Sequence, residues 1–273
     1  MGKLNLEFFK EDNYNTEINS RIIWDKLFLN TRLYFLIKHI LLVFKNRKLA
    51  IKGLYDRKAW VLSSFDVFSL IEKCGGKFQI DGIDNIRNCK EPAVFVSNHM
   101  SAMESMIFPC LIAPFREVTF VVKESLTTNP LFGPIMRARE PIAIGRSNSR
   151  EDLMLVMKTG KEFLEKGISI IIFPQGGRRD IFKAEEFNSL GVKLAKSAGM
   201  KVIPIALKTD FWGNGNIIKD LGPIRRKRKI MISIGKPIEI TGNGKKQNDQ
   251  AIEFIGQKLK EWKIKALTHN LCK

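Results

Sequence analysis

The residues Asn98, His99 and Glu104 carry the strongest signal for chemistry in this sequence, directly after the apolar run 93–96. Unperturbed imidazole titrates near pH 6.5, so a histidine can accept a proton from a hydroxyl at neutral pH. It does so efficiently when a partner on its other ring nitrogen fixes the tautomer and steadies the cation. We therefore interpret His99 as a candidate general base and Glu104 as the carboxylate that orients it.

The spacing of this pair requires a bend in the chain. Two residues five positions apart on an ideal helix point about 140° away from each other. The sequence therefore predicts that residues 94–96 end a buried strand, that 97–99 form a turn, and that Ser101 or a neighbour caps a helix. That helix would carry Glu104 back toward the imidazole. The alternative interpretation is that His99 and Glu104 form a solvated pair on the surface. The other motifs distinguish between this pair and a catalytic one.

Two arginines follow apolar runs and are suited to holding an anion. A guanidinium presents a planar fork of donors that matches phosphate or carboxylate oxygens, so Arg146 and Arg178 are candidates for binding an anionic head group. The alternative is that both simply mark the edge of a sheet and stay solvated.

Gly176 and Gly177 follow Pro174 and Gln175 at the end of another apolar run, 168–173. Consecutive glycines allow positive φ and a close approach of backbone N–H groups to a phosphate or an oxyanion. An ordinary tight turn after a buried strand is the other interpretation.

Four blocks occur in one order along residues 77–210: Asn98-His99 to Glu104; Lys123 through Leu126, Pro130, Gly133 and Ile144 to Arg146; Phe173-Pro174-Gln175-Gly176-Gly177-Arg178; and Val202-Ile203-Pro204-Ile205-Ala206. Together they resemble the glycerolipid acyltransferase superfamily, whose best-known members are the PlsC-type lysophosphatidic acid acyltransferases. The resemblance implies that His99 and Glu104 are catalytic and that Arg146 and Arg178 hold the head group. It also implies that Lys123 lies near the reacting carbonyl, although a lysine leaving a strand is ordinarily solvated.

The chain departs from the family pattern at three positions. Glu104 stands where the family usually has aspartate, and Gln175 and Gly177 stand where the third motif usually reads Phe-Pro-Glu-Gly-Thr-Arg. Gln175 removes a negative charge beside Arg178, so we expect that arginine to be freer to bind an anion. The acceptor stays open between lysophosphatidic acid, another lyso-phospholipid and a non-glycerol lipid such as a lyso-aminoacyl lipid.

The expected mechanism is direct acyl transfer without an acyl-enzyme. His99 would deprotonate the acceptor hydroxyl as its oxygen attacks the thioester of acyl-CoA or acyl-carrier protein, while backbone donors and Lys123 stabilise the oxyanion. A Ser-His hydrolase is disfavoured because the chain has no Gly-x-Ser-x-Gly elbow. We expect neither a metal nor a cofactor, since the cysteines fall singly and are expected to be ordinary buried or free thiols: Cys74, Cys89, Cys110 and Cys272.

The formal net charge of +18, from 46 basic and 28 acidic residues, predicts an anionic partner. An anionic membrane attracts basic segments, and a phosphate-bearing lipid lies on the same surface. The densest cluster is 225–229, but no aromatic or nucleic-acid motif accompanies it, so nucleic-acid binding is disfavoured. A non-catalytic lipid-binding protein remains the other alternative.

The segment 27–44 consists mostly of apolar residues, yet polar pairs recur in and around it at Asp25-Lys26, Thr31-Arg32, Lys38-His39 and Lys45-Asn46. This pattern predicts an amphipathic helix that lies in the headgroup region, because Lys38 and His39 interrupt any spanning run. It places His39 on the polar stripe. With no cleavable signal peptide in evidence, we expect a peripheral or monotopic protein on the cytoplasmic face of a membrane. A helix packed into the core is the alternative.

The rest of the chain alternates short β-branched runs with helical patterns, which predicts an α/β fold with a mixed central sheet flanked by helices. We expect an N-terminal membrane-associating segment, 1–75, with a second helix at 59–71, and an acyltransferase domain, 76–273. The predicted strands are 78–80, 93–96, 118–122, 142–144, 169–173, 202–207 and 229–234. The predicted helices are 149–166, 187–198 and 250–264.

Overall fold

A computed structural model of the chain describes residues 6–17, 19–28, 31–216 and 219–271, with 265–271 described by their backbone alone. Cys272, predicted to be a buried or free thiol, lies outside the described residues, whereas Cys74, Cys89 and Cys110 form no disulfide. The described strands form one eight-stranded sheet in the order β1-β2-β8-β7-β3-β6-β4-β5. Their bounds are β1 Tyr14–Asn15, β2 Phe78–Asp81, β3 Ala93–Ser97, β4 Val118–Lys123, β5 Ile142–Ile144, β6 Ser169–Ile172, β7 Lys201–Lys208 and β8 Ile230–Ile234.

The sheet is mixed, as predicted. Strands β7, β3, β6, β4 and β5 lie side by side in that order and run parallel to one another. Strands β2 and β8 also pair parallel, but β7 pairs antiparallel with β8, and β1 pairs antiparallel with β2. Every residue of β3, β6 and β8 is buried, which is why these strands read as continuous apolar runs. The carboxyl ends of β7, β3 and β6 therefore meet at one edge of the sheet.

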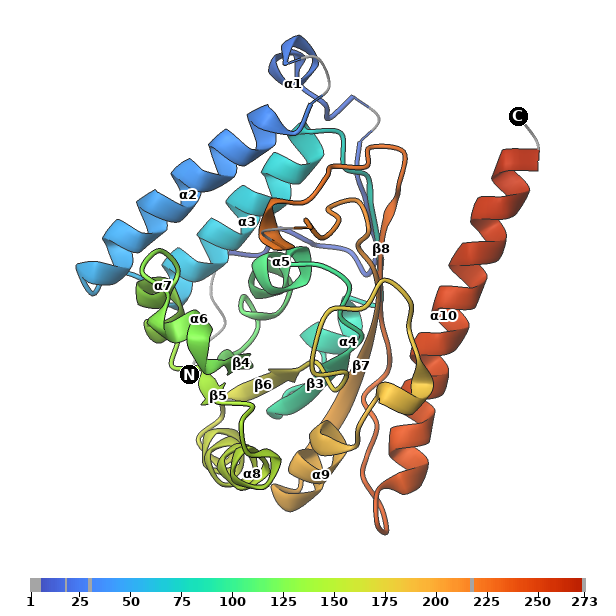
Figure 1. Cartoon of the computed structure of the whole chain (residues 1–273). Coiled ribbons are helices and arrows are strands. Elements are labelled where there is room, and N and C mark those ends of the chain that lie inside the picture. Colours follow the sequence, from blue (N-terminus) through green and yellow to red (C-terminus); the bar gives the residue numbers. More distant parts are fainter. Residues whose placement is uncertain (1–5, 18, 29–30, 217–218, 272–273) are drawn as a thin grey trace.

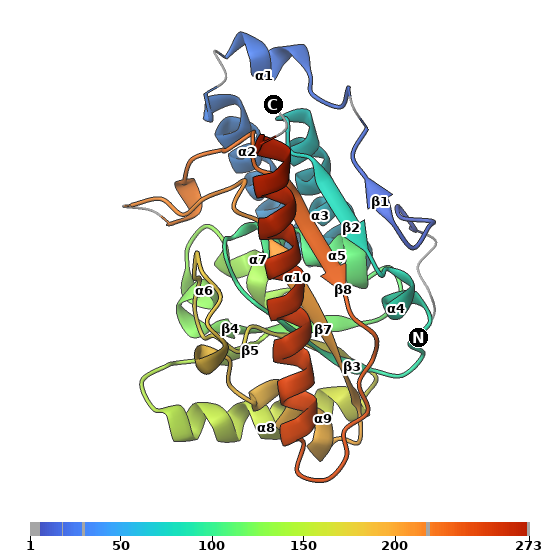
Figure 2. The ribbon, with the colours of Figure 1, turned by 90° about the vertical axis from the view of Figure 1, so that its right-hand side faces the viewer.

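Helices cover both faces of the sheet (Figures 1 and 2). Helices α2 (Leu33–Ile51), α3 (Arg57–Lys73) and α5 (Met103–Ile112) share one apolar cluster with the sheet. Helices α8 (Ser149–Glu165), α9 (Leu190–Ser197) and α10 (Lys245–Leu271) contribute to the cluster on the opposite face. The shorter helices are α1 Ile23–Leu27, α4 Asp84–Arg87, α6 Glu124–Thr128, α7 Gly133–Arg137, η1 Ala184–Glu186 and η2 Lys219–Leu221.

All seven predicted strands are present, and two of the predicted helices begin elsewhere for a local reason. The helix predicted at 187–198 begins at Leu190, because the side chain of Asn188 accepts a hydrogen bond from the Leu190 N–H at 2.9 Å. The helix predicted at 250–264 begins at Lys245, whose N–H is accepted by Asn243 at 3.0 Å. Each asparagine side chain thus bonds the N–H of the first helical residue, and this bond fixes the residue at which the helix begins.

The predicted single helix 27–44 is wrong as one element, although Leu29 and Asn30 within it lie outside the described residues. The chain forms α1, ends it, and restarts as α2 at Leu33, where the Thr31 hydroxyl accepts from the Leu33 N–H at 3.3 Å. The helix predicted at 59–71 is confirmed as α3, and it begins earlier because Asp56 caps it through the Ala59 N–H.

The first two helices expose an unusual number of large apolar side chains. These are Ile23, Trp24 and Leu27 on α1, Phe28 after it, and Leu33, Ile37, Ile40, Leu41, Phe44 and Ile51 on α2. The α2 positions recur at the spacing of one helix face. None of the described helices is long and apolar enough to cross a membrane.

The prediction that His39 belongs to the polar stripe of this helix is wrong, because the residue is buried, with only 4% of its surface exposed. Its ring lies parallel to that of Phe35, with centroids 5.8 Å apart, and meets Trp212 edge-on at 5.1 Å. Phe35 precedes His39 by one helical turn, so both residues share the face of α2 that packs against Trp212.

Replacing His39 with phenylalanine should make the protein more resistant to acid. Burial lowers the pKa of His39 to about 4, only partly opposed by the charge of Asp220. Below its ordinary value of about 6.5 the unfolded chain binds a proton that the folded chain excludes, so stability falls as the pH drops toward 4. We expect wild type to lose about 2–3 kcal/mol more unfolding free energy than His39→Phe between pH 7.5 and pH 4.5, measured by urea denaturation. Parallel losses in both proteins would contradict the buried, neutral histidine.

Two arginines of the basic cluster 225–229 form ion pairs with carboxylates of the protein itself. Arg226 reaches the fully buried Asp25 at 2.6 Å, and Arg228 pairs with Asp210 at 2.6 Å. Arg21 also pairs with Asp25, so this buried carboxylate is compensated from two sides. The cluster thus ties the turn before β8 to α1.

Candidate active site

The candidate site lies where the parallel strands β7, β3 and β6 end side by side. Val96 of β3 pairs with Ile172 of β6, and Ser97 pairs with Ile205 of β7. The segments that follow these strands carry His99, Gln175 and Thr209 to one edge of the sheet. Open α/β sheets bind ligands in the crevice outside the carboxyl ends of such strands.

Asn98 fixes the backbone immediately before His99. Its side chain is 1% exposed, donates to the Leu207 carbonyl at 2.8 Å and accepts from the Leu207 N–H at 2.8 Å. The Asn98 amide therefore makes the two hydrogen bonds to β7 that a peptide group of a neighbouring strand would make. These bonds hold the turn that follows β3. The sequence pattern indicates Asn98 only as a neighbour of His99, because Leu207 lies far along the chain.

His99 and Glu104 meet across the predicted bend. Strand β3 ends at Ser97, α5 begins at Met103, and the Ser101 hydroxyl accepts from the Met103 N–H at 3.1 Å. The Nδ1 atom of His99 lies 3.3 Å from Oε2 of Glu104. With Nδ1 directed to the carboxylate, Nε2 is the nitrogen that remains for a substrate proton.

The Glu104 carboxylate is fully buried and held by several donors. It accepts from the backbone N–H groups of Met100 at 3.0 Å and Ser101 at 2.9 Å, and from the Thr209 hydroxyl. Burial alone would raise the pKa of Glu104, but the hydrogen bond and charge of His99, with the donors Thr209 and Ser101, lower it below its ordinary value. Glu104 is therefore ionised at neutral pH and able to steady a protonated imidazole.

The loop after β6 holds His99 from the other side. The Gln175 side-chain oxygen accepts from the His99 N–H at 3.2 Å, and the Arg179 N–H donates to the His99 carbonyl at 2.8 Å. The His99 ring stacks on Phe173 with centroids 4.1 Å apart. The third motif therefore supports the histidine directly.

The two glycines of this loop differ in their surroundings. Gly176 has a φ of 66° and its N–H donates to the Phe173 carbonyl at 3.0 Å, so it forms the tight turn that was the alternative interpretation. Gly177 follows at the start of the stretch that carries Arg178. Whether either glycine contacts a ligand stays a prediction.

Arg178 is not left without a carboxylate partner, which corrects the expectation drawn from Gln175. Its Nη1 lies 2.6 Å from Oδ1 of Asp220, in the short helix η2. The Arg178 side chain is 20% exposed, and a guanidinium so far withdrawn from water favours a counter-charge. Asp220 takes that position from a segment far along the chain.

A cavity of about 90 Å³ adjoins these residues. Its lining includes Ala102 and Ser105, which flank Glu104 in sequence, together with Arg178 and Asp220. Most of the remaining lining is apolar, with Trp60 of α3, Phe120 of β4 and Phe132, just before α7, as its bulkiest members. The cavity is thus a small, mostly apolar hollow beside the pair of Arg178 and Asp220.

Lys123 and Arg146 are exposed and do not line this cavity. Lys123 is the last residue of β4, opposite Ile144. Arg146 has a φ of 64°, and its N–H donates to Asp152 at 2.9 Å. Their expected contacts with substrate stay predictions.

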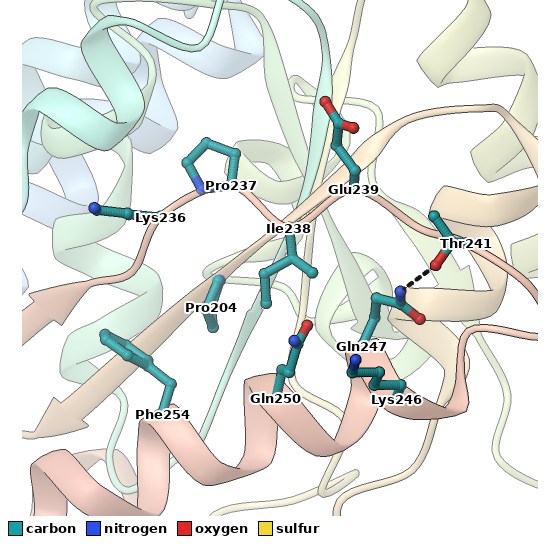
Figure 3. A pocket seen from close by; sticks show the side chains of 10 residues that line it. All are labelled: Pro204, Lys236, Pro237, Ile238, Glu239, Thr241, Lys246, Gln247, Gln250 and Phe254. Atoms are coloured by element: carbon teal, nitrogen blue, oxygen red, sulfur yellow. Dashed lines mark hydrogen bonds between the residues drawn. The ribbon is translucent and has the colours of Figure 1, made fainter.

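A second hollow, of about 650 Å³, lies on the other face of the sheet between Pro204, the segment 236–241 and the first turns of α10 (Figure 3). Gln247 donates to Thr241 at 2.7 Å across it, and none of the predicted site residues lines it. Within the described part of the chain, no three His, Cys, Asp or Glu side chains come together as metal ligands.

The chain is similar to known proteins over the region that carries this site. A family model described as Acyltransferase matches residues 77–208. The 1-acyl-sn-glycerol-3-phosphate acyltransferase of Pseudomonas aeruginosa is 30% identical over 189 residues, which are 69% of this chain and 68% of the relative. The chloroplastic LPAT1 of Arabidopsis thaliana is 28% identical over 59% of this chain, but only 44% of that relative is covered. The crystal structure of PlsC from Thermotoga maritima shares the fold, with a TM-score of 0.60, 19% identity and coverage of 89% of this chain and 98% of that one.

Proposed function

The chain belongs to the acyltransferase family, and on this premise we propose that it transfers a fatty acyl group to the hydroxyl of a lysophosphatidic acid, 1-acylglycerol 3-phosphate, in phospholipid biosynthesis. The observation that carries the proposal is the His99–Glu104 pair beside an apolar cavity that also has Arg178 in its lining. The relatives from P. aeruginosa and A. thaliana are named for this reaction.

In the proposed mechanism, His99 acts first as a base and then as an acid. Its Nε2 takes the proton of the acceptor hydroxyl while the oxygen attacks the thioester carbonyl of acyl-CoA or acyl-carrier protein. Glu104 holds Nδ1 and stabilises the imidazolium. The tetrahedral oxyanion then collapses, the C–S bond breaks, and the departing sulfur receives the proton from His99. Backbone donors of the loop with Gly176 and Gly177, and Lys123, are the candidates for stabilising the oxyanion.

Arg178 is proposed to hold the acceptor phosphate, with Arg146 as a further contact. Replacing Arg178 with alanine should raise KM for lysophosphatidic acid roughly tenfold or more, because it removes a charge-assisted clamp, and should change kcat much less. The measurement is steady-state kinetics with lysophosphatidic acid and with uncharged monoacylglycerol. An equal loss with both acceptors would contradict the clamp.

We also propose that the apolar face of α1 and α2 lies on the cytoplasmic surface of an anionic membrane, as a peripheral or monotopic attachment. The exposed apolar side chains of these helices support this placement. The net charge of +18 favours a negatively charged surface. In this proposal residues 1–75 form the membrane-associating segment and 76–273 the catalytic domain.

The proposed reaction is tested with purified protein on anionic vesicles, offered acyl-CoA or acyl-carrier protein and a panel of acceptors. The panel contains lysophosphatidic acid, other lyso-phospholipids and a lyso-aminoacyl lipid. Lysophosphatidic acid should have the highest kcat/KM. Transfer only to another acceptor would overturn the proposed substrate, and acyl-chain binding without transfer to any acceptor would favour a lipid-binding protein.

A further inference from the structure

The pair of Arg178 and Asp220 lies at the cavity where the proposed acceptor must bind. Both side chains line the apolar cavity together with Ala102 and Ser105, the neighbours of the dyad. Their 2.6 Å contact occupies the guanidinium, the group proposed to hold phosphate. The Asp220 side chain is 35% exposed, so its carboxylate borders water as well as Arg178.

The segment that carries Asp220 is anchored to the site and to α2. Near its start, Thr209 donates to Glu104 and Asn214 donates to the Met100 carbonyl at 2.8 Å. Next to Asp220, the Leu221 carbonyl accepts from Arg32 at 2.6 Å, just before α2 begins. These contacts keep Asp220 within reach of Arg178 when the ion pair itself is broken.

We propose that Asp220 is a positioning residue that competes with the substrate phosphate for Arg178, so that the two anions exchange on this guanidinium in every turnover. The inference rests on the proposed function. Carboxylate and phosphate oxygens match the same fork of N–H donors. Asp220 borders water, so its carboxylate can be hydrated when a phosphate monoester, with a charge near −2, replaces it as the counter-charge of Arg178.

The exchange has a consequence for the end of the reaction. The product carries the same phosphate as the acceptor, so an unopposed arginine would hold substrate and product equally tightly. Return of the Asp220 carboxylate to Arg178 weakens the hold on both. Asp220 thereby sets KM higher and makes product release easier.

The test is Asp220→Asn, which keeps the side-chain shape and removes the competing charge. We expect KM for lysophosphatidic acid and the inhibition constant of the product, phosphatidic acid, to fall together by roughly three- to tenfold, with no rise in kcat. The charge-matched control is Asp249→Asn, an exposed carboxylate on α10 that does not line the cavity, and it should change both constants less than twofold. In an Arg178→Ala background, Asp220→Asn should have no further effect on KM.

A KM that is unchanged or raised in Asp220→Asn would overturn the exchange, since it would mean that the carboxylate is neutral to, or supports, phosphate binding. A second readout needs no turnover: calorimetric titration with sn-glycerol 3-phosphate, which Asp220→Asn should bind tighter than wild type by the same factor. If wild type transfers no acyl group, the proposed function fails while this titration still decides the role of Asp220.

Discussion

Replacement of His99 by alanine is expected to lower kcat for acyl transfer about 10³-fold, with a small change in KM for the acceptor. Without Nε2 no positioned group takes the proton from the acceptor hydroxyl, and a neutral alcohol attacks a thioester slowly. The neighbouring supports of the site, Asn98 against β7 and Gln175 against the His99 backbone, do not depend on the imidazole. The binding of both substrates should therefore survive the substitution.

The measurement is the initial rate of acyl transfer by wild type and His99→Ala, with urea unfolding as the control for folding. The ring is 14% exposed and stacks on Phe173, so some loss of unfolding free energy is expected from packing alone. A folded variant that keeps more than a tenth of the wild-type kcat would remove His99 from the mechanism.

Replacement of Glu104 by glutamine is the second large effect, with an expected fall in kcat on the order of 10². The amide is neutral, so it stabilises the imidazolium much less than the carboxylate does. It also cannot accept from Met100, Ser101 and Thr209 with both of its terminal atoms, as the carboxylate does. The tautomer and orientation of His99 are then no longer fixed.

Glu104→Asp is the matched variant, since it retains the charge and shortens the side chain by one methylene. We expect it to keep kcat within about tenfold of wild type, because only the reach of one methylene is lost. Comparison of kcat for the two variants on lysophosphatidic acid separates charge from shape. Equal losses in Glu104→Asp and Glu104→Gln would contradict an electrostatic role for the carboxylate.

The sheet and the approach of Glu104 to His99 were predictable because they rest on local patterns. Buried parallel strands leave short β-branched and apolar runs, and all seven such runs became strands. The spacing of His99 and Glu104 required a bend, and the structure has that bend between β3 and α5.

The partners that support the site were not predictable, because strand pairing brings them together. Thr209 is distant from Glu104 in the chain, and only the neighbourhood of β3 and β7 joins them. Asp220 likewise reaches Arg178 from a segment with no motif, so the absence of a carboxylate at Gln175 did not leave the arginine free.

The polar pattern of the N-terminal helices did not predict which polar residues are buried. Lys38 and His39 are adjacent polar residues, yet Lys38 is exposed and His39 is buried against Trp212. The two residues have similar hydropathy. Neighbouring side chains on a helix point about 100° apart, however, and only His39 points toward a packed segment.

The most direct test of the central claim, that His99 and Glu104 act as one unit in acyl transfer, is a double-mutant cycle. The rate of formation of labelled phosphatidic acid is measured for wild type, His99→Ala, Glu104→Gln and the double variant. Since Glu104 works through the imidazole, the double variant should be no slower than His99→Ala alone. A double variant slowed by the product of the two single effects would contradict the dyad.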